Sequence, residues 1–290
     1  MRRFGRRPLL AAALSLIAGA AGLTISTPAQ AEPREVPATG TFTVSGEAGE
    51  PLTGGNSYAF STDAGDEMRL WGHDQEITVR VFGGWHLILV SGSDRPLAPG
   101  TYTDALGYPW PGPNPGLTLV GPNGPCDESV GSFTITDVVF APYGYMEKLD
   151  ASFEVYCDGA PVPARGEVHL TNPPAAPLLD PRATVADTGT IALRYGAATV
   201  HGTLTCRQAA TLNINGAVTQ GRVRIWFAAT DLQCAPDQVV EWAATTTPVD
   251  GLRFRPGDAE VAAQVEGRDP FYDEYVQVDV GPTTVRLTRA

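Results

Sequence analysis

Four cysteines are the residues of this chain with the widest choice of chemistry. Cys126, Cys157, Cys206 and Cys234 could act as nucleophiles, as metal ligands or as partners in disulfide bonds. A zinc site would need cysteines and histidines clustered at short spacings such as C-x-x-C, and the sequence contains no such cluster. A catalytic thiol needs a nearby base that lowers its pKa, and no histidine is next to a cysteine in the sequence. The even number of cysteines therefore favours disulfides.

A proline-rich stretch separates the first two cysteines from the last two. Residues 172–177, NPPAAP, have the composition of a linker between domains. The sequence thus predicts one bridge between Cys126 and Cys157 and another between Cys206 and Cys234, while the two other pairings stay open. Each predicted bridge closes a loop of about 30 residues, which corresponds to about 3–4 kcal/mol of stabilisation from chain entropy.

Two groups of carboxylates have the chemistry of a calcium site, because calcium prefers oxygen ligands. They lie in STDAGDEM and GRDPFYDEY, and their members are Asp63, Asp66, Glu67, Asp269, Asp273 and Glu274. Neither group matches the spaced D-x-[DN]-x-[DN]-G loop, and an acidic chain also forms such clusters for solubility alone. Calcium is the only cofactor that the sequence suggests. The same acids could form a glycosidase pair, but two carboxylates in a loop do not define a cleft.

The sequence nominates no catalytic residue. It has no G-x-S-x-G elbow. His86 and His169 lie within strand-like runs, where a structural role is expected, and His73 lies beside Gly72 in an expected turn. A triad assembled only in space stays open.

An aromatic loop is the best candidate for ligand binding. In the stretch YTDALGYPWPGPNPG, residues 102–116, prolines stiffen the chain around Tyr108 and Trp110. Rings that are held rigidly can stack on sugars or apolar ligands with little loss of entropy. The alternative is that these rings only cover an open end of the fold.

The elements that position these residues are predicted to be strands. Short runs rich in β-branched and aromatic residues, such as EITVRVF and WHLILV, alternate with Gly, Pro, Asn and Asp. The sequence predicts an all-β protein with two tandem β-sandwich domains, at residues 37–172 and 183–290, joined by a linker at residues 173–182. The second domain is predicted to be immunoglobulin-like. The pair Gly83-Gly84 predicts a hairpin with a two-residue turn.

The start of the chain predicts export. Residues 1–31 combine the basic segment MRRFGRR, an apolar run shorter than a membrane-spanning helix, and the small-x-small site Ala29-Gln30-Ala31. This is the pattern of a cleaved signal peptide, followed by a short N-terminal segment at residues 32–36. The pair Arg6-Arg7 leaves the twin-arginine route open beside the general one. The mature chain is expected to be secreted, extracellular and not membrane-bound.

Cleavage would make the chain more acidic. The signal peptide carries four of the 20 Lys+Arg and no acid, so 16 basic residues would face 32 acidic ones, a net charge of −16. Nucleic acids and anionic membranes need basic surfaces, so neither is expected as a partner.

Each half also resembles a secreted domain family that is frequent in actinobacteria. The first half carries L-x-P-G-x-Y at residues 97–102 and A-x-F-E-x-x-C at residues 151–157. The second carries G-T-x-x-C at residues 202–206, V-T-Q at residues 218–220 and F-x-x-G-x-A at residues 254–259. Both families are of unknown function, so the resemblance implies a fold and a location but no catalytic residue.

These observations lead to a hypothesis about function. The chain is expected to be a noncatalytic extracellular module that binds a neutral or cationic partner, such as an environmental or cell-wall polysaccharide, through the aromatic loop. One alternative is a hydrolase that acts on an extracellular polymer. Another is a small-molecule carrier that resembles the acidic sandwich apoproteins of streptomycetes, although their cysteine spacing differs.

Overall fold

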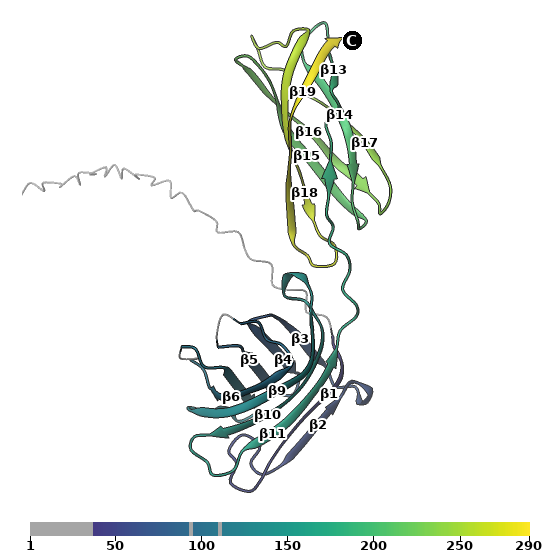
Figure 1. Ribbon diagram of the computed structural model, residues 1–290. Coiled ribbons are helices and arrows are strands. Elements are labelled where there is room, and N and C mark those ends of the chain that lie inside the picture. Colours follow the sequence, from purple (N-terminus) through teal and green to yellow (C-terminus); the bar gives the residue numbers. More distant parts are fainter. Residues whose placement is uncertain (1–36, 93–94, 110–111) are drawn as a thin grey trace, which may run out of the picture. The chain divides into compact units, whose positions relative to one another are not determined.

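The computed structural model describes residues 37–92, 95–109 and 112–290 (Figure 1). The predicted signal peptide at residues 1–31, the segment at residues 32–36 and Trp110 lie outside the described residues. Strands dominate the rest, together with two single-turn 3-10 helices, η1 (Thr62–Ala64) and η2 (Pro142–Gly144). The prediction of an all-β protein is confirmed. In the part of the chain that the structure describes, no helix has the length and apolarity needed to cross a membrane.

The first half of the chain forms one curled sheet of eleven strands. The strands are β1 (Thr39–Gly46), β2 (Ser57–Ser61), β3 (Met68–His73), β4 (Glu76–Val81), β5 (Trp85–Val90), β6 (Gly100–Leu106), β7 (Gly116–Gly121), β8 (Gly124–Pro125), β9 (Ser129–Phe140), β10 (Met146–Cys157) and β11 (Ala164–Thr171). Their order is β2-β1-β11-β10-β9-β6-β7-β5-β4-β3, with β8 beside β7.

This sheet folds over into two layers. The layers β2-β1-β11-β10-β9-β6 and β7-β5-β4-β3 are joined at β6 and β7 by a single parallel pair, Leu106 with Gly116. At the other edge, a bridge between Pro37 and Arg69 links the start of β1 to β3. The predicted sandwich is therefore built from one continuous sheet that meets itself at both edges.

Strict alternation of residues along the strands fills the space between the layers. In β5, Trp85, Leu87 and Leu89 are buried, while His86, Ile88 and Val90 point to the outer face and are only partly covered. Successive side chains of a strand point to opposite faces, so one stretch supplies both a core and a surface. The core includes an aromatic group in which the ring of Phe42 lies 6.0 Å from that of Phe153 and 6.5 Å from that of Trp85.

The second half forms a separate sheet of eight strands. They are β12 (Arg182–Ala183), β13 (Thr188–Ile191), β14 (Ala198–Thr205), β15 (Ala210–Gln220), β16 (Val223–Cys234), β17 (Val240–Thr245), β18 (Gly257–Arg268) and β19 (Tyr275–Arg289). Strands β12, β14 and β17 pair in one layer, and β19, β18, β15 and β16 in the other. Strand β13 runs parallel to β19 and also pairs briefly with β14, so it joins the layers.

A three-stranded layer packed on a four-stranded one matches the predicted immunoglobulin-like arrangement. The core of this half extends into the predicted linker, because Leu179 is fully buried in it. The backbone of Leu179 also accepts a hydrogen bond from the Arg207 N–H at 2.9 Å. The last residues of the segment 173–182 thus pack on the second sheet.

Both predicted disulfides are confirmed. Cys126 is bonded to Cys157 with 5.4 Å between their Cα atoms, and Cys206 is bonded to Cys234 with 6.1 Å. In the second bridge, Cys206 directly follows β14 and Cys234 ends β16, so this bridge links the two layers.

The hairpin predicted at Gly83-Gly84 connects β4 to β5, but its loop has three residues. Val81 pairs with Trp85, so Phe82 belongs to the turn. The Phe82 N–H donates to the carbonyl of Glu67 at 2.9 Å, outside the hairpin, which explains why the turn is one residue longer than expected.

The motifs behind the family resemblance have structural roles. In L-x-P-G-x-Y, the Tyr102 hydroxyl accepts from the Ala98 N–H at 2.8 Å and donates to the Ala98 carbonyl at 2.9 Å, which closes the loop before β6. The Tyr102 ring stacks on Phe133 with 4.5 Å between centroids. In V-T-Q, the Gln220 amide bonds the backbone of Arg255 and Asp258 and so holds the segment that leads into β18.

Candidate functional site

A cavity of about 740 Å³ lies beside the aromatic loop, on the outer face of the first sheet. Tyr108 and Pro109 line it from the loop, Ile88 from β5, and Thr118 and Val120 from β7. Its walls are mainly apolar. The volume falls within the range of about 300–1,000 Å³ that is common for ligand pockets.

The described part of the loop is fixed by backbone hydrogen bonds. The Leu106 N–H donates to the Pro115 carbonyl at 2.9 Å, and the Gly107 N–H donates to the Ser129 carbonyl at 2.9 Å. The Tyr108 N–H donates to the Thr118 hydroxyl at 3.2 Å. The Tyr108 side chain itself is 70% exposed. The hydrogen bonds fix the backbone at Tyr108, and a ligand can reach its exposed ring.

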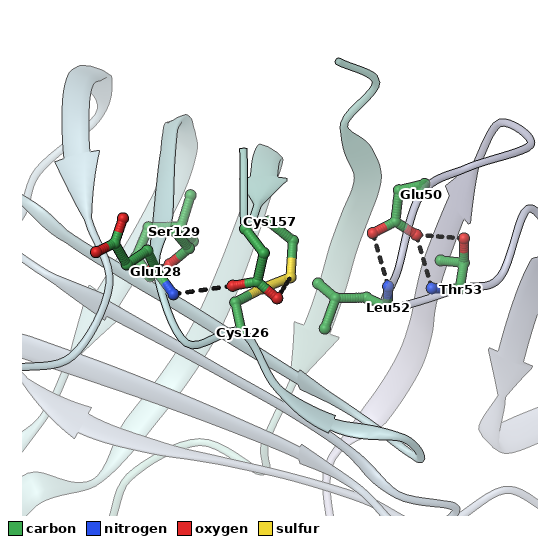
Figure 2. Close-up of a disulfide and its surroundings, with 9 residues drawn as sticks. Glu50, Leu52, Thr53, Cys126, Glu128, Ser129 and Cys157 are labelled. Carbon is green, nitrogen blue, oxygen red and sulfur yellow. Dashed lines mark hydrogen bonds between the residues drawn. A yellow bond between two sulfur atoms is a disulfide. The ribbon is translucent and has the colours of Figure 1, made fainter. Parts of the chain in front are cut away.

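The first disulfide forms the opposite wall of this cavity. Figure 2 shows Cys126 bonded to Cys157, with Glu128 and Ser129 alongside. Cys157 is buried, whereas Cys126 lines the cavity. The Glu128 N–H donates to the carboxylate of Asp158 at 3.0 Å. The disulfide and this hydrogen bond fix the wall and leave the Glu128 side chain at an exposed rim.

A second cavity, of about 480 Å³, lies over the same outer face. Trp71 of β3, Arg80 of β4 and His86 of β5 line it, together with the β4–β5 hairpin. The Trp71 and His86 rings lie nearly parallel, 6.4 Å apart. His86 is directly opposite Val120, which lines the first cavity. The two cavities thus lie next to each other on one face of the sheet, where β5 pairs with β7.

Aromatic side chains stand at both ends of this face. Trp71 pairs with Thr78, Thr78 with Ile88, and Ile88 with Thr118, whose hydroxyl holds the backbone of Tyr108. Three inter-strand steps separate β3 from β7, or about 14 Å at the usual strand spacing. We call this set of cavities and rings the aromatic face.

The imidazole of His86 is the most unusual polar group on the aromatic face. Burial lowers the pKa of His86, and the positive charge of Arg80 lowers it further. The ring is therefore neutral at pH 7. Its Nε2 atom is buried and finds no hydrogen-bond partner within the described residues. Buried polar atoms are usually paired, so this unpaired Nε2 is an exception in the packing of the described residues.

Two arginines flank Phe82, which lines the second cavity together with Arg80. The guanidinium carbons of Arg69 and Arg80 lie 4.9 and 5.1 Å from the centre of the Phe82 ring. Arg69 also pairs with Glu67 at 3.1 Å, while Arg80 forms no ion pair with any described residue. Arg80 therefore keeps its N–H donors for other contacts.

The first acidic group predicted to bind calcium is engaged by protein donors. Asp63 lies in η1, and the Asp66 carboxylate accepts from the Ser61 N–H at 2.8 Å. The Glu67 carboxylate pairs with Arg69. The Asp66 and Glu67 carboxylates therefore serve separate local contacts, whereas Asp63 donates its backbone N–H to the Ser61 hydroxyl.

The second acidic group contains a buried carboxylate. Asp269 is fully buried and accepts from the backbone N–H groups of Leu179, Phe271 and Tyr272 at 2.9, 3.0 and 3.0 Å. Asp273 pairs with Arg268 at 3.1 Å, and Glu274 contributes its carbonyl to the Asp269 N–H. Among residues 37–92, 95–109 and 112–290, no group of three or more His, Cys, Asp or Glu is placed to hold a metal. The arrangement gives the calcium hypothesis no support.

Sequence reasoning found Tyr108 but missed Trp71, Arg80 and His86. His86 was expected only to have a structural role within a strand, and it is the pairing of β3, β4, β5 and β7 that brings His86 and Ile88 to the same face as Tyr108. No protein-family model matches the chain, and no curated protein matches it. The resemblance to two actinobacterial families stays a prediction.

Proposed function

We propose that the protein is a secreted binding module that holds a neutral polysaccharide along the aromatic face. The observation that carries this proposal is that two neighbouring cavities lie on one sheet face, one lined by Tyr108 and the other by Trp71. An elongated face suits a polymer better than a single compact ligand.

The residue types match sugar chemistry. Aromatic rings offer apolar faces to the C–H groups of a pyranose and lose little side-chain entropy on binding. Arg80 supplies N–H donors, and Glu128 supplies an acceptor at the rim. The expected net charge of −16 would disfavour the approach of an anionic polymer.

The disulfides support the extracellular part of this proposal. Disulfides persist in oxidising compartments, and the chain has one in each half. The signal peptide predicted at residues 1–31 accounts for export.

Affinity electrophoresis against hydroxyethylcellulose, glycol chitin, laminarin, xylan and polygalacturonate tests the proposal. A neutral polymer should retard the protein, and Tyr108→Ala should weaken binding about tenfold, which corresponds to the loss of one aromatic contact. Trp71→Ala should have a similar effect. Tyr195→Ala is the matched control, because Tyr195 is 56% exposed and lines no described cavity of the aromatic face. Retardation that survives both substitutions, or no retardation by any neutral polymer, would reject the aromatic face as the site.

The mainly apolar walls beside Tyr108 favour a second candidate, a carrier of small apolar molecules. A carrier would bind a monomeric apolar compound tightly and ignore the polymers. Calorimetry with 1-anilinonaphthalene-8-sulfonate as an apolar probe, in competition with the retarding polymer, separates the two candidates. Release of reducing ends that His86→Ala or Glu128→Gln abolishes would instead establish hydrolysis.

A further inference from the structure

A cavity of about 310 Å³ lies on the outer face of the second sheet, away from any residue discussed above. Trp226 of β16 forms one side of it and is 63% exposed. Trp226 is directly opposite Ala217 of β15, which is directly opposite Ala262 of β18. Of the two alanines, Ala262 lines the cavity, which we call the trough, beside the Trp226 ring, while Ala217 is buried.

The Trp226 ring is held in place from one side. The guanidinium of Arg224 lies 5.0 Å from its centroid, which is the geometry of a cation–π contact. Both side chains line the same cavity. The ring is therefore oriented before any ligand arrives, which reduces the entropy that binding would cost.

A row of polar groups flanks the trough. Asn215 is opposite Gln264, and Gln264 is opposite Asp279. The Gln264 amide donates to Asp279 at 2.8 Å, and the Asn215 amide donates to Glu266 at 2.6 Å. These bonds orient both amides and leave each amide oxygen, together with a second N–H, for further hydrogen bonds.

We propose that this trough is a second carbohydrate site, which takes a neutral pyranose ring stacked on Trp226. The sugar ring lies over Ala262, and its hydroxyls bond to Asn215, Gln264 and Asp279. The Asp279 carboxylate accepts hydrogen bonds from hydroxyls and repels a uronic acid.

The inference goes beyond the function proposed for the aromatic face, because no residue is shared between the two sites. It holds whether or not Tyr108 binds a ligand. If both sites bind the same polymer, the second contact becomes intramolecular and raises the overall affinity.

Fluorine NMR of the full chain labelled with 5-fluorotryptophan tests this site directly. Trp226→Phe identifies the Trp226 resonance among those of the five tryptophans. Cellohexaose, chitohexaose and laminarihexaose are then titrated at millimolar concentrations. At least one should shift the Trp226 resonance saturably, and Gln264→Ala should weaken that titration several-fold.

The matched control is Tyr195→Ala, since the Tyr195 ring also has an arginine above it, Arg194 at 5.2 Å, but lines no part of this trough. This variant and Tyr108→Ala should leave the Trp226 titration unchanged. A Trp226 resonance that no neutral hexasaccharide moves would overturn the proposal. If trigalacturonate shifts the Trp226 resonance and the neutral hexasaccharides do not, the proposal of a neutral ligand is wrong. Loss of polymer retardation in Tyr108→Ala, with the Trp226 shift retained, would separate the two sites.

Discussion

The buried carboxylate of Glu50 accepts hydrogen bonds from both the backbone N–H and the hydroxyl of Thr53 (Figure 2). It also accepts from the Leu52 N–H at 2.8 Å. A Cβ atom on Gly46 would lie 2.7 Å from the Glu50 carboxylate and 2.4 Å from the Thr53 hydroxyl. The glycine-rich turn after β1 is thus built around one buried acid.

Replacement of Glu50 by alanine should destabilise the protein by about 3 kcal/mol. The substitution leaves two buried backbone N–H groups without an acceptor, and each such group costs about 1–3 kcal/mol. Urea unfolding at neutral pH measures the change. Glu47→Ala, at an exposed position of the same turn, should change stability by less than about 0.5 kcal/mol. Equal effects of the two substitutions would contradict this account.

Lys148, the only lysine of the chain, separates two opposed carboxylates. Asp137 and Asp150 face each other across β9 and β10, and the Lys148 ammonium lies 2.8 Å from each. Burial acts to raise the pKa of Asp150, but hydrogen bonds from Lys148 and His169 outweigh it and hold the pKa below 3.8. The stability that Asp150 contributes is therefore present above about pH 3.8 and is lost as pH falls through the lower native pKa.

Lys148→Met should lower the urea midpoint at neutral pH, because it leaves two like charges directly opposite each other. The difference from the wild type should shrink toward about pH 4, where the carboxylates begin to protonate. Arg182→Met serves as the control, since it breaks an exposed ion pair with Asp180 in which no second acid is opposed. If Lys148→Met lowers the urea midpoint equally at neutral pH and at about pH 4, repulsion between the carboxylates is not the cause.

Local patterns were enough to predict the strands and the disulfides. The run WHLILV was predicted to be a strand and forms β5, and the proline-rich stretch indicated the cysteine pairing that the structure shows. What could not be predicted depends on contacts between distant segments. Asp269 belongs to an acidic run, yet it is buried because N–H groups from two segments converge on it. The partners of Tyr108 on the aromatic face likewise follow from strand order, which no single stretch encodes.

The first disulfide is expected to matter for binding as well as for stability. Its 31-residue separation corresponds to about 3–4 kcal/mol of unfolded-state entropy. Since Cys126 lines the cavity beside Tyr108, replacing Cys126 and Cys157 by alanine should also weaken the retardation by the neutral polymer. Replacing Cys206 and Cys234, with a separation of 28, should cost similar stability and leave that retardation intact. Thermal unfolding measures the stability of both double variants, and affinity electrophoresis measures their binding to the polymer. An equal loss of binding in both variants would contradict a role of the first disulfide in the cavity wall.

The pH dependence of stability should report the environment of His86. Burial, and then Arg80, lower the native pKa of His86 below 6.5. Between the native pKa and 6.5 the unfolded chain binds more protons than the native one, so the free energy of unfolding falls as pH decreases through this window. His86→Gln removes the titrating group and should flatten the profile between about pH 5 and 7. Arg80→Gln removes only the positive charge that adds to the effect of burial on the His86 pKa. It should therefore flatten the stability profile less than His86→Gln does. Urea unfolding between about pH 5 and 7 measures the slope of unfolding free energy against pH for the wild type and both variants. A His86→Gln slope equal to that of the wild type would show that other groups cause the pH dependence.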